Sequence, residues 1–359
     1  MKKFVWVLLA CLLCTVSVRA VEIPQELRDA LPEGASELLE HLDFSGSDAL
    51  SGGISRILQS AADKVRGVVQ ERLRNAVSIL LVVILCGIIE GVSKTTGNAV
   101  SAKALTMAGA LLVTLLTVGS LDTLMGLGTQ TIEDLSQFSK VLLPTLAAAA
   151  AAGGAVGSAT LQQVATVFFA DLLMNLINGL LMPMVYLYTG VLTAGAILPD
   201  GRLGGIASAM KKVITWILSG ALILFTLYLS VVHIVSGTAD SLAVKMAKTA
   251  ISGVVPVVGS IISEASETVL LGAGMLKSSI GVFGMLAVLA ACAYPFLQLG
   301  VQYLLYKLTA FLAEMVGAGD LGKLIDGLGG AFGVVLGMTG ACAILLLISI
   351  LASIAAVIP

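Results

Sequence analysis

Asp171, Asn175 and Asn178 are the first residues of this chain whose types and spacing could do chemistry. Steps of four and three residues place the three side chains on one face of a helix, inside an otherwise apolar stretch. An unpaired ionisable group is costly in a bilayer, so such a face turns toward protein or water. The spacing indicates either a polar path through the membrane or hydrogen bonds that fix neighbouring helices.

A second polar face follows Pro295 and contains Gln298, Gln302 and Lys307. Lys307 could form an ion pair with Asp171 if the two stretches lie side by side. The same alternatives apply here, a coupling site for transport or interhelical packing. The two faces together are the candidate intramembrane site.

The remaining motifs argue against an enzyme. Residues 317–320, Gly-Ala-Gly-Asp, resemble an element of intramembrane aspartyl proteases, but that chemistry needs a second membrane aspartate, and no Tyr-Asp partner precedes it. A turn is the better interpretation. The sequence has no phosphate loop with Gly-Lys-Ser or Gly-Lys-Thr and no His or Cys cluster with metal-ligand spacing. We expect no catalytic residue, no metal and no cofactor.

The composition predicts that membrane helices position the polar faces. Of 359 residues, 58% are hydrophobic and 12% charged, and the mean hydropathy is +1.03, more apolar surface than a water-soluble fold could bury. Backbone polar groups in lipid must be satisfied within the segment, which favours an all-α, polytopic fold. The formal net charge of −2 supplies no basic stripe for nucleic acid.

Apolar windows predict seven to nine spans, because a hydrocarbon core of ~30 Å needs about 20 residues of helix. The candidate windows are 76–93, 104–121, 141–157, 161–180, 181–198, 213–236, 279–297, 298–316 and 331–357. Residues 131–143 and 242–275 mix charged and apolar residues at helical spacing. These two segments are predicted to be amphipathic surface helices, re-entrant pieces or helices that pack against another subunit.

Three regions follow from this pattern. Residues 1–20 contain Lys2 and Lys3, a short apolar stretch and a small-residue end at Ala20, which is typical of a signal peptide. Residues 21–75 are then an external polar and amphipathic segment, too short for an independent core. Residues 76–359 form the multi-span membrane domain.

The membrane domain has a possible two-repeat organisation, over about 104–198 and 213–316. Pro144 and Pro256 are 112 residues apart, and so are Pro183 and Pro295. Interrupted spans at matching positions of two halves point to a transport pathway, although proline is also common in membrane helices without that role.

A distinctive sequence pattern begins at residues 251–260, which read Ile-Ser-Gly-Val-Val-Pro-Val-Val-Gly-Ser. They are followed by Ser-Glu-Ala-Ser-Glu-Thr at 263–268, by residues 272–277 and by the stretch that runs to Phe311. This sequence pattern resembles that of the stage III sporulation protein AE family, and the resemblance extends over nearly the whole chain. It rests on pattern and carries over no functional residue.

The resemblance implies a membrane subunit of the secretion-like channel complex that links mother cell and forespore in endospore formation and supports forespore development and late gene expression. Its location would be the mother-cell membrane that surrounds the forespore. Its partners would be other proteins of the stage III sporulation operon, including an ATPase-like protein and intermembrane ring proteins, and a forespore membrane protein. The alternative function, favoured by the possible repeat and the polar faces, is an autonomous secondary transporter of a small solute.

Overall fold

The computed structural model describes residues 23–32, 34–39, 49–95, 99–152, 156–197, 203–228 and 258–355. Within these ranges all regular structure is helical, as predicted. The elements are α2 (Gln25–Asp29), α3 (Ser36–Leu39), α4 (Ala49–Thr95), α5 (Ala99–Ala152), α6 (Val156–Leu176), η1 (Ile177–Leu181), α7 (Met182–Ile197), α9 (Val258–Met315) and α10 (Gly319–Ala355). A further long helix, Leu203–Tyr228, lies between α7 and α9 in the chain. The predicted signal peptide lies outside the described residues.

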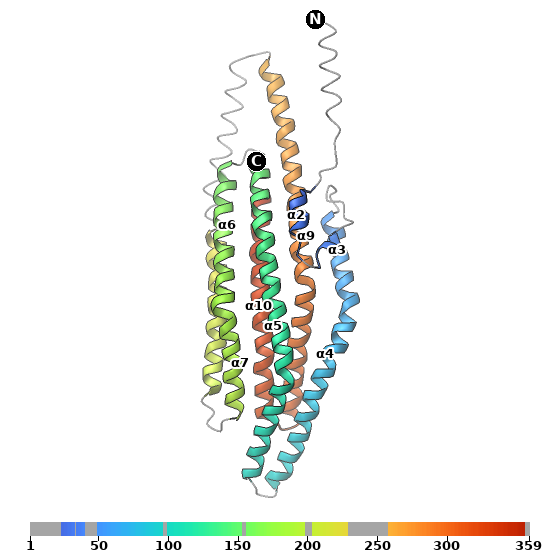
Figure 1. Ribbon diagram of the computed structural model, residues 1–359, viewed down its shortest axis with the longest axis vertical. Coiled ribbons are helices and arrows are strands. Elements are labelled where there is room, and N and C mark those ends of the chain that lie inside the picture. The colour runs from blue at the N-terminus through green and yellow to red at the C-terminus, as the bar shows by residue number, and fades with distance from the viewer. Residues whose placement is uncertain are drawn as a thin grey trace.

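Six long helices run in alternating directions and form one elongated bundle (Figure 1). Each is long and apolar enough to cross a membrane, with α6, η1 and α7 together forming one of them. α4, α5 and α9 contain 47, 54 and 58 residues, which correspond to about 70, 80 and 87 Å at a rise of 1.5 Å per residue. Since the hydrocarbon core is ~30 Å thick, these three helices continue well outside it.

The nine apolar windows of the sequence fall on six helices. The windows that merge are 104–121 with 141–157 in α5, 161–180 with 181–198 in α6–η1–α7, and 279–297 with 298–316 in α9. The prediction of separate spans within each pair was wrong, because a bilayer-length window measures apolar length and does not locate a helix end. Residues 131–143 likewise continue α5. Residues 242–257 lie outside the described part.

Pro183 explains the π-helical turn η1. Proline has no N–H, and its ring clashes with the carbonyl four residues earlier, here that of Gly179. A widened turn immediately before Pro183 accommodates the ring, so the helix continues through the proline. Pro295 also lies inside a helix. The two-repeat plan stays a prediction, because Pro256 lies outside the described residues.

The turn between α9 and α10 is a Schellman-type helix ending. Gly317 has a φ of +91°, a left-handed conformation that glycine adopts without steric cost. The N–H of Ala318 donates to the carbonyl of Ala313 at 3.0 Å, and that of Gly317 to the carbonyl of Glu314 at 3.1 Å. These bonds satisfy two of the last carbonyls of α9. The turn predicted for residues 317–320 is confirmed at Gly317 and Ala318, whereas Gly319 and Asp320 already begin α10.

α9 and α10 occupy the centre of the bundle and are the most buried of the six long helices. Glycines bring α5 close to both of them. A Cβ added at Gly284 of α9 would lie 2.8 Å from the Leu142 side chain, and one at Gly128 of α5 would lie 2.5 Å from Val335 of α10. Such close backbone approach is typical of helix packing in membranes, where small residues form the contact.

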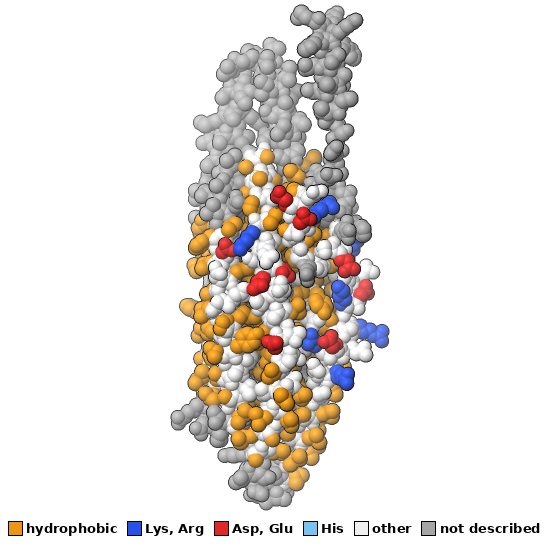
Figure 2. All heavy atoms as spheres, in the orientation of Figure 1, with side chains coloured by type: hydrophobic (Ala, Val, Ile, Leu, Met, Phe, Trp, Pro, Cys, Tyr) orange, Lys and Arg blue, Asp and Glu red, His pale blue; other side chains and the backbone are white. Residues whose placement is uncertain are grey.

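The surfaces of α4 and α5 change character at one level. The exposed residues of α4 between 51 and 75 include many charged ones, whereas those between 77 and 92 are all apolar or glycine. The exposed residues of α5 are all apolar between 104 and 118 and all polar or glycine between 119 and 140. Figure 2 shows the result: apolar side chains cover the lower end of the described surface, and most charged side chains lie above them. The start of the first span at residue 76 stays a prediction, because the helix itself begins at Ala49.

Candidate functional site

A polar seam lies inside the bundle where α4, α5 and α9 meet. On α9 it consists of residues spaced by four, which share one helix face, namely Tyr294, Gln298, Gln302 and Tyr306. On α4 and α5 it consists of Arg72, Asn75, Thr117 and Ser120. Three helices therefore contribute side chains to one strip between them, which is buried except at Asn75 and Tyr294 and which we call the polar seam.

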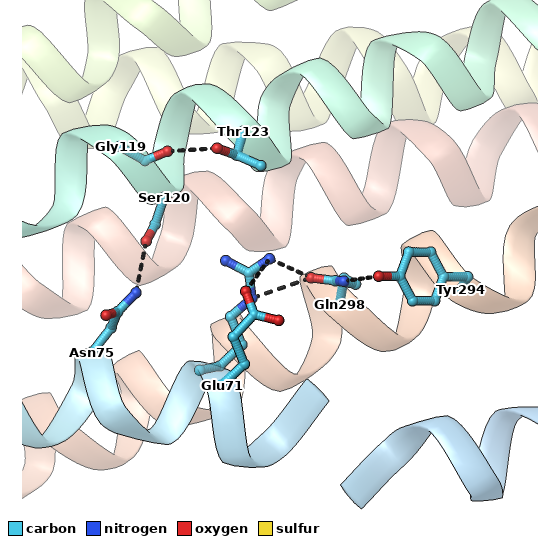
Figure 3. A network of polar contacts seen from close by, with 8 residues as sticks. Glu71, Asn75, Gly119, Ser120, Thr123, Tyr294 and Gln298 are labelled. Carbon is cyan, nitrogen blue, oxygen red and sulfur yellow. Dashed lines mark hydrogen bonds and ion pairs between the residues drawn. The ribbon is translucent and has the colours of Figure 1, made fainter. Parts of the chain in front are cut away.

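Arg72 and Gln298 join α4 to α9 in this seam (Figure 3). The guanidinium of Arg72 donates to Oε1 of Gln298 from Nε at 3.1 Å and also from Nη2. Nε2 of Gln298 donates in turn to the Tyr294 hydroxyl at 2.5 Å. Both Arg72 and Gln298 are buried, while the carboxylate of Glu71, 3.8 Å from Arg72, is exposed. The charge of Arg72 is therefore met by an amide oxygen inside and by a carboxylate at the surface.

Two further hydrogen bonds connect α5 to its neighbours. Nδ2 of Asn75 donates to Oγ of Ser120 at 3.4 Å, and the Tyr306 hydroxyl donates to Oγ1 of Thr117 at 3.0 Å. Thr117 and Tyr306 are fully enclosed. Buried polar groups need such partners, because an unpaired one keeps its full desolvation cost.

Gln302 is the exception within the polar seam. Its side chain is 0% exposed, and it lies near the Tyr306 hydroxyl. Neither its amide oxygen nor its amide nitrogen completes a hydrogen bond of acceptable length and angle. A buried amide without a hydrogen bond lowers the free energy of unfolding. The Gln302 amide is therefore the one group of the seam that hydrogen bonding does not stabilise.

Lys307 lies apart from Gln298 and Gln302. Five residues after Gln302, it points to another side of α9 and forms an ion pair with Asp326 of α10, with Nζ and Oδ1 2.5 Å apart. The second predicted face is therefore divided, with its two glutamines in the polar seam and its lysine at the α9–α10 contact.

Asp171 pairs with Lys140 of α5 at 3.5 Å, and both side chains are about half-exposed. The predicted ion pair between Asp171 and Lys307 was wrong, because each has a different partner on a neighbouring helix. Asn175 is exposed, and Asn178 lies in η1 with its Oδ1 enclosed and without a hydrogen bond. Of these three residues, Asp171 contacts α5 through Lys140. No described hydrogen bond or ion pair joins the three to the polar seam.

Several residues of the site were missed by sequence reasoning. The spacing of Tyr294, Gln298, Gln302 and Tyr306 by four was a signal that could have found the tyrosines. Arg72 was not among the predicted site residues, although an arginine one turn before an apolar window is a candidate interior partner. Thr117 and Ser120 carry no such signal, because small hydroxyl residues are common in membrane helices.

The arrangement holds helices together by hydrogen bonds and presents no set of reactive groups in the described part of the chain. Asp320, the aspartate of the protease-like string, forms an exposed pair with Lys323 at 3.2 Å. Among the described residues, no group of three or more His, Cys, Asp or Glu side chains could hold a metal ion.

The six apolar helices and the buried polar seam define a multi-pass, all-α membrane protein. The chain belongs to the stage III sporulation protein AE family, whose pattern matches residues 38–357. It is 22% identical over 253 residues to stage III sporulation protein AE of Bacillus subtilis (strain 168), an alignment that covers 69% of this chain and 62% of the relative. The chain thus spans less than two thirds of the length of that relative. No solved structure matches it.

Proposed function

We propose that this chain is a membrane subunit of a secretion-like channel complex that links mother cell and forespore during endospore formation. The family supports a role in sporulation. The length of the helices carries the subunit proposal, because α4, α5 and α9 extend well beyond the ~30 Å of a hydrocarbon core and leave surface outside it for partner proteins.

The outer half of α4, residues 51–75, is the surface we assign to the intermembrane partners. It includes Arg56, Asp63 and Arg66, all exposed. The proposed partners are an ATPase-like protein and intermembrane ring proteins, which the stage III sporulation operon encodes. A forespore membrane protein is a further proposed partner, reached through the complex. The proposed location is the mother-cell membrane around the forespore, and the proposed outcome is support of forespore development and late gene expression.

The alternative, an autonomous secondary transporter, draws on the polar side chains within the spans. The polar seam favours the subunit instead, since most of its members are joined by hydrogen bonds across helices and fix the bundle. A transporter would need these bonds to open during each cycle.

Co-purification of the tagged chain from detergent-solubilised membranes of sporulating cells tests the proposal. We expect the ATPase-like and ring proteins in stoichiometric amounts, and the loss of the ring proteins from the double variant Arg56→Glu and Arg66→Glu. The matched control is Lys323→Glu, an exposed charge at the opposite end of the bundle, which should keep the partners. A chain that purifies alone and moves solute into liposomes would overturn the proposal in favour of the transporter.

A further inference from the structure

A basic cluster lies where four helices meet at one turn of α10. The long helix between α7 and α9 brings the amine of Lys211 against α10 at Gly330. A Cβ added at Gly330 would lie 2.7 Å from Nζ of Lys211 and 3.1 Å from the hydroxyl of Tyr188 on α7. One turn earlier on α10, Asp326 forms the ion pair with Lys307 of α9. The missing side chain at position 330 therefore gives the Lys211 amine its place between the helices.

The cluster lies at the height where the surface of α5 changes from apolar to polar. Gly329, next to Gly330, packs so closely on α9 that an added Cβ would lie 2.9 Å from the Cβ of Tyr306. The Tyr306 hydroxyl donates to Thr117 at 3.0 Å, and the apolar surface of α5 ends at residue 118. A change from apolar to polar surface is expected at the headgroup region of a bilayer.

Lys212 and Trp216 mark the same height on the helix that carries Lys211. Both are exposed, Trp216 to 79%, and a step of four residues places them on one helix face. Tryptophan and basic residues are enriched where membrane helices meet the water interface. Two separate parts of the bundle, α5 and this helix, therefore place the cluster at the level of phospholipid headgroups.

The positive charge of Lys211 is not balanced within the described part of the chain. The carboxylate of Asp326 is already paired with Lys307, and these two side chains are 48% and 34% exposed. No ion pair among the described residues includes Lys211. The Tyr188 hydroxyl donates its proton to the carbonyl of Gly327 at 2.8 Å, so toward the Lys211 amine it offers only a lone pair. An anion from outside the chain would complete the cluster.

We propose that Lys211 and Lys212 bind a phosphate group, and that its source is the headgroup of an anionic phospholipid. Basic pockets between membrane helices bind such headgroups. Lys211 supplies an amine that is positioned at Gly330, Lys212 supplies an exposed one, and the ion pair of Lys307 with Asp326 borders the site. The site is separate from the polar seam and does not depend on the channel proposal.

Thermal unfolding of the purified, delipidated chain in a non-ionic detergent tests the site. The probes are phosphatidylglycerol, phosphatidylcholine and inorganic phosphate, each titrated at constant ionic strength. A ligand that binds only the folded protein raises the unfolding temperature with its concentration, so each titration gives a half-saturating concentration. The variants are Lys211→Gln and Lys212→Gln. The matched control is Lys140→Gln, because Lys140 has its own carboxylate partner and lies about 30 Å along α5 from Ser120.

We expect phosphatidylglycerol to raise the unfolding temperature of the unmutated chain at concentrations at which phosphatidylcholine does not. Lys211→Gln and Lys212→Gln should each raise the half-saturating concentration about fivefold, which is the effect of one lysine near an anionic surface. Lys140→Gln should leave that concentration unchanged. Lys211→Arg, which keeps the positive charge, should retain the response to phosphatidylglycerol.

Equal shifts with phosphatidylglycerol and phosphatidylcholine would overturn the site. So would a response to phosphatidylglycerol that Lys211→Gln and Lys212→Gln retain as fully as Lys140→Gln does. A shift with inorganic phosphate that is absent with phosphatidylglycerol would keep the phosphate chemistry and overturn the lipid as its source. If Lys211→Gln does not fold, Lys212→Gln decides the question, because the Lys212 side chain is exposed.

Discussion

Asn75 donates a hydrogen bond to Ser120 at 3.4 Å, at the level where α4 and α5 both change from a polar to an apolar surface. The bond joins two helices that are adjacent in the chain and fixes their register at that height. Below it, residues 77–95 of α4 correspond to about 28 Å of helix, close to the thickness of a hydrocarbon core. The pair therefore marks the height at which the surface of this hairpin changes from polar to apolar.

Replacing Gln298 with Met should destabilise the protein by about 2–3 kcal/mol, because the change leaves the buried guanidinium of Arg72 without its amide partner. Thermal unfolding in detergent measures the loss. The double variant Arg72→Met with Gln298→Met should recover part of it, since no buried charge is then left unpaired. Unchanged stability of the single variant would show that Arg72 reaches water.

Replacing Gln302 with Met should have the opposite effect and stabilise the protein by about 1–2 kcal/mol, because it removes an enclosed amide that completes no hydrogen bond. The same unfolding assay compares it with the Gln298 variant, which lies one turn away on the same helix face. A decrease in stability would mean that an internal water or another side chain satisfies the amide.

Gly128 and Gly126 form a matched pair on α5. Gly128→Ala should cost about 1–3 kcal/mol, because its Cβ would meet Val335 at 2.5 Å and a β-branched side chain cannot turn away. Gly126→Ala, which has no atom within 4 Å, should gain up to about 1 kcal/mol from helix propensity. Equal effects of the two changes would contradict the close contact between α5 and α10.

Asp171→Asn should change stability by less than about 1 kcal/mol, because ion pairs with exposed side chains contribute little and this pair is about half-exposed. Assembly, followed by gel filtration, should be normal. Any loss of sporulation in this variant then reports on a functional role of the Asp171 carboxylate apart from packing. A variant that fails to assemble would assign Asp171 to packing.

The fold class and the turn at Gly317 could be predicted from the sequence because each depends on local chemistry. Apolar length reports burial in lipid, and glycine at position 317 reports a left-handed helix ending. The family could be inferred from the sequence pattern of residues 251–311, although residues 251–257 lie outside the described part.

The partner of Asp171 could not be predicted in the same way. Lys140 and Lys307 both lie in or beside apolar windows, and only the packing of α5 against α6 brings Lys140 near. The sequence also did not predict that α9 continues through Pro295, because a proline can either end a helix or be accommodated within it. The polar seam depends on three helices that are far apart in the chain, which local patterns do not report.

α4 has no proline and continues without a break from Ala49 to Thr95. Besides the bonds at Arg72 and Asn75 near its midpoint, α4 packs closely on Leu286 of α9 at Gly53 and on Val316 at Gly87. It is therefore held to α9 along its length. A partner that displaces the outer half of α4 would move α9 with it, and the two helices together would carry a mechanical signal along the bundle.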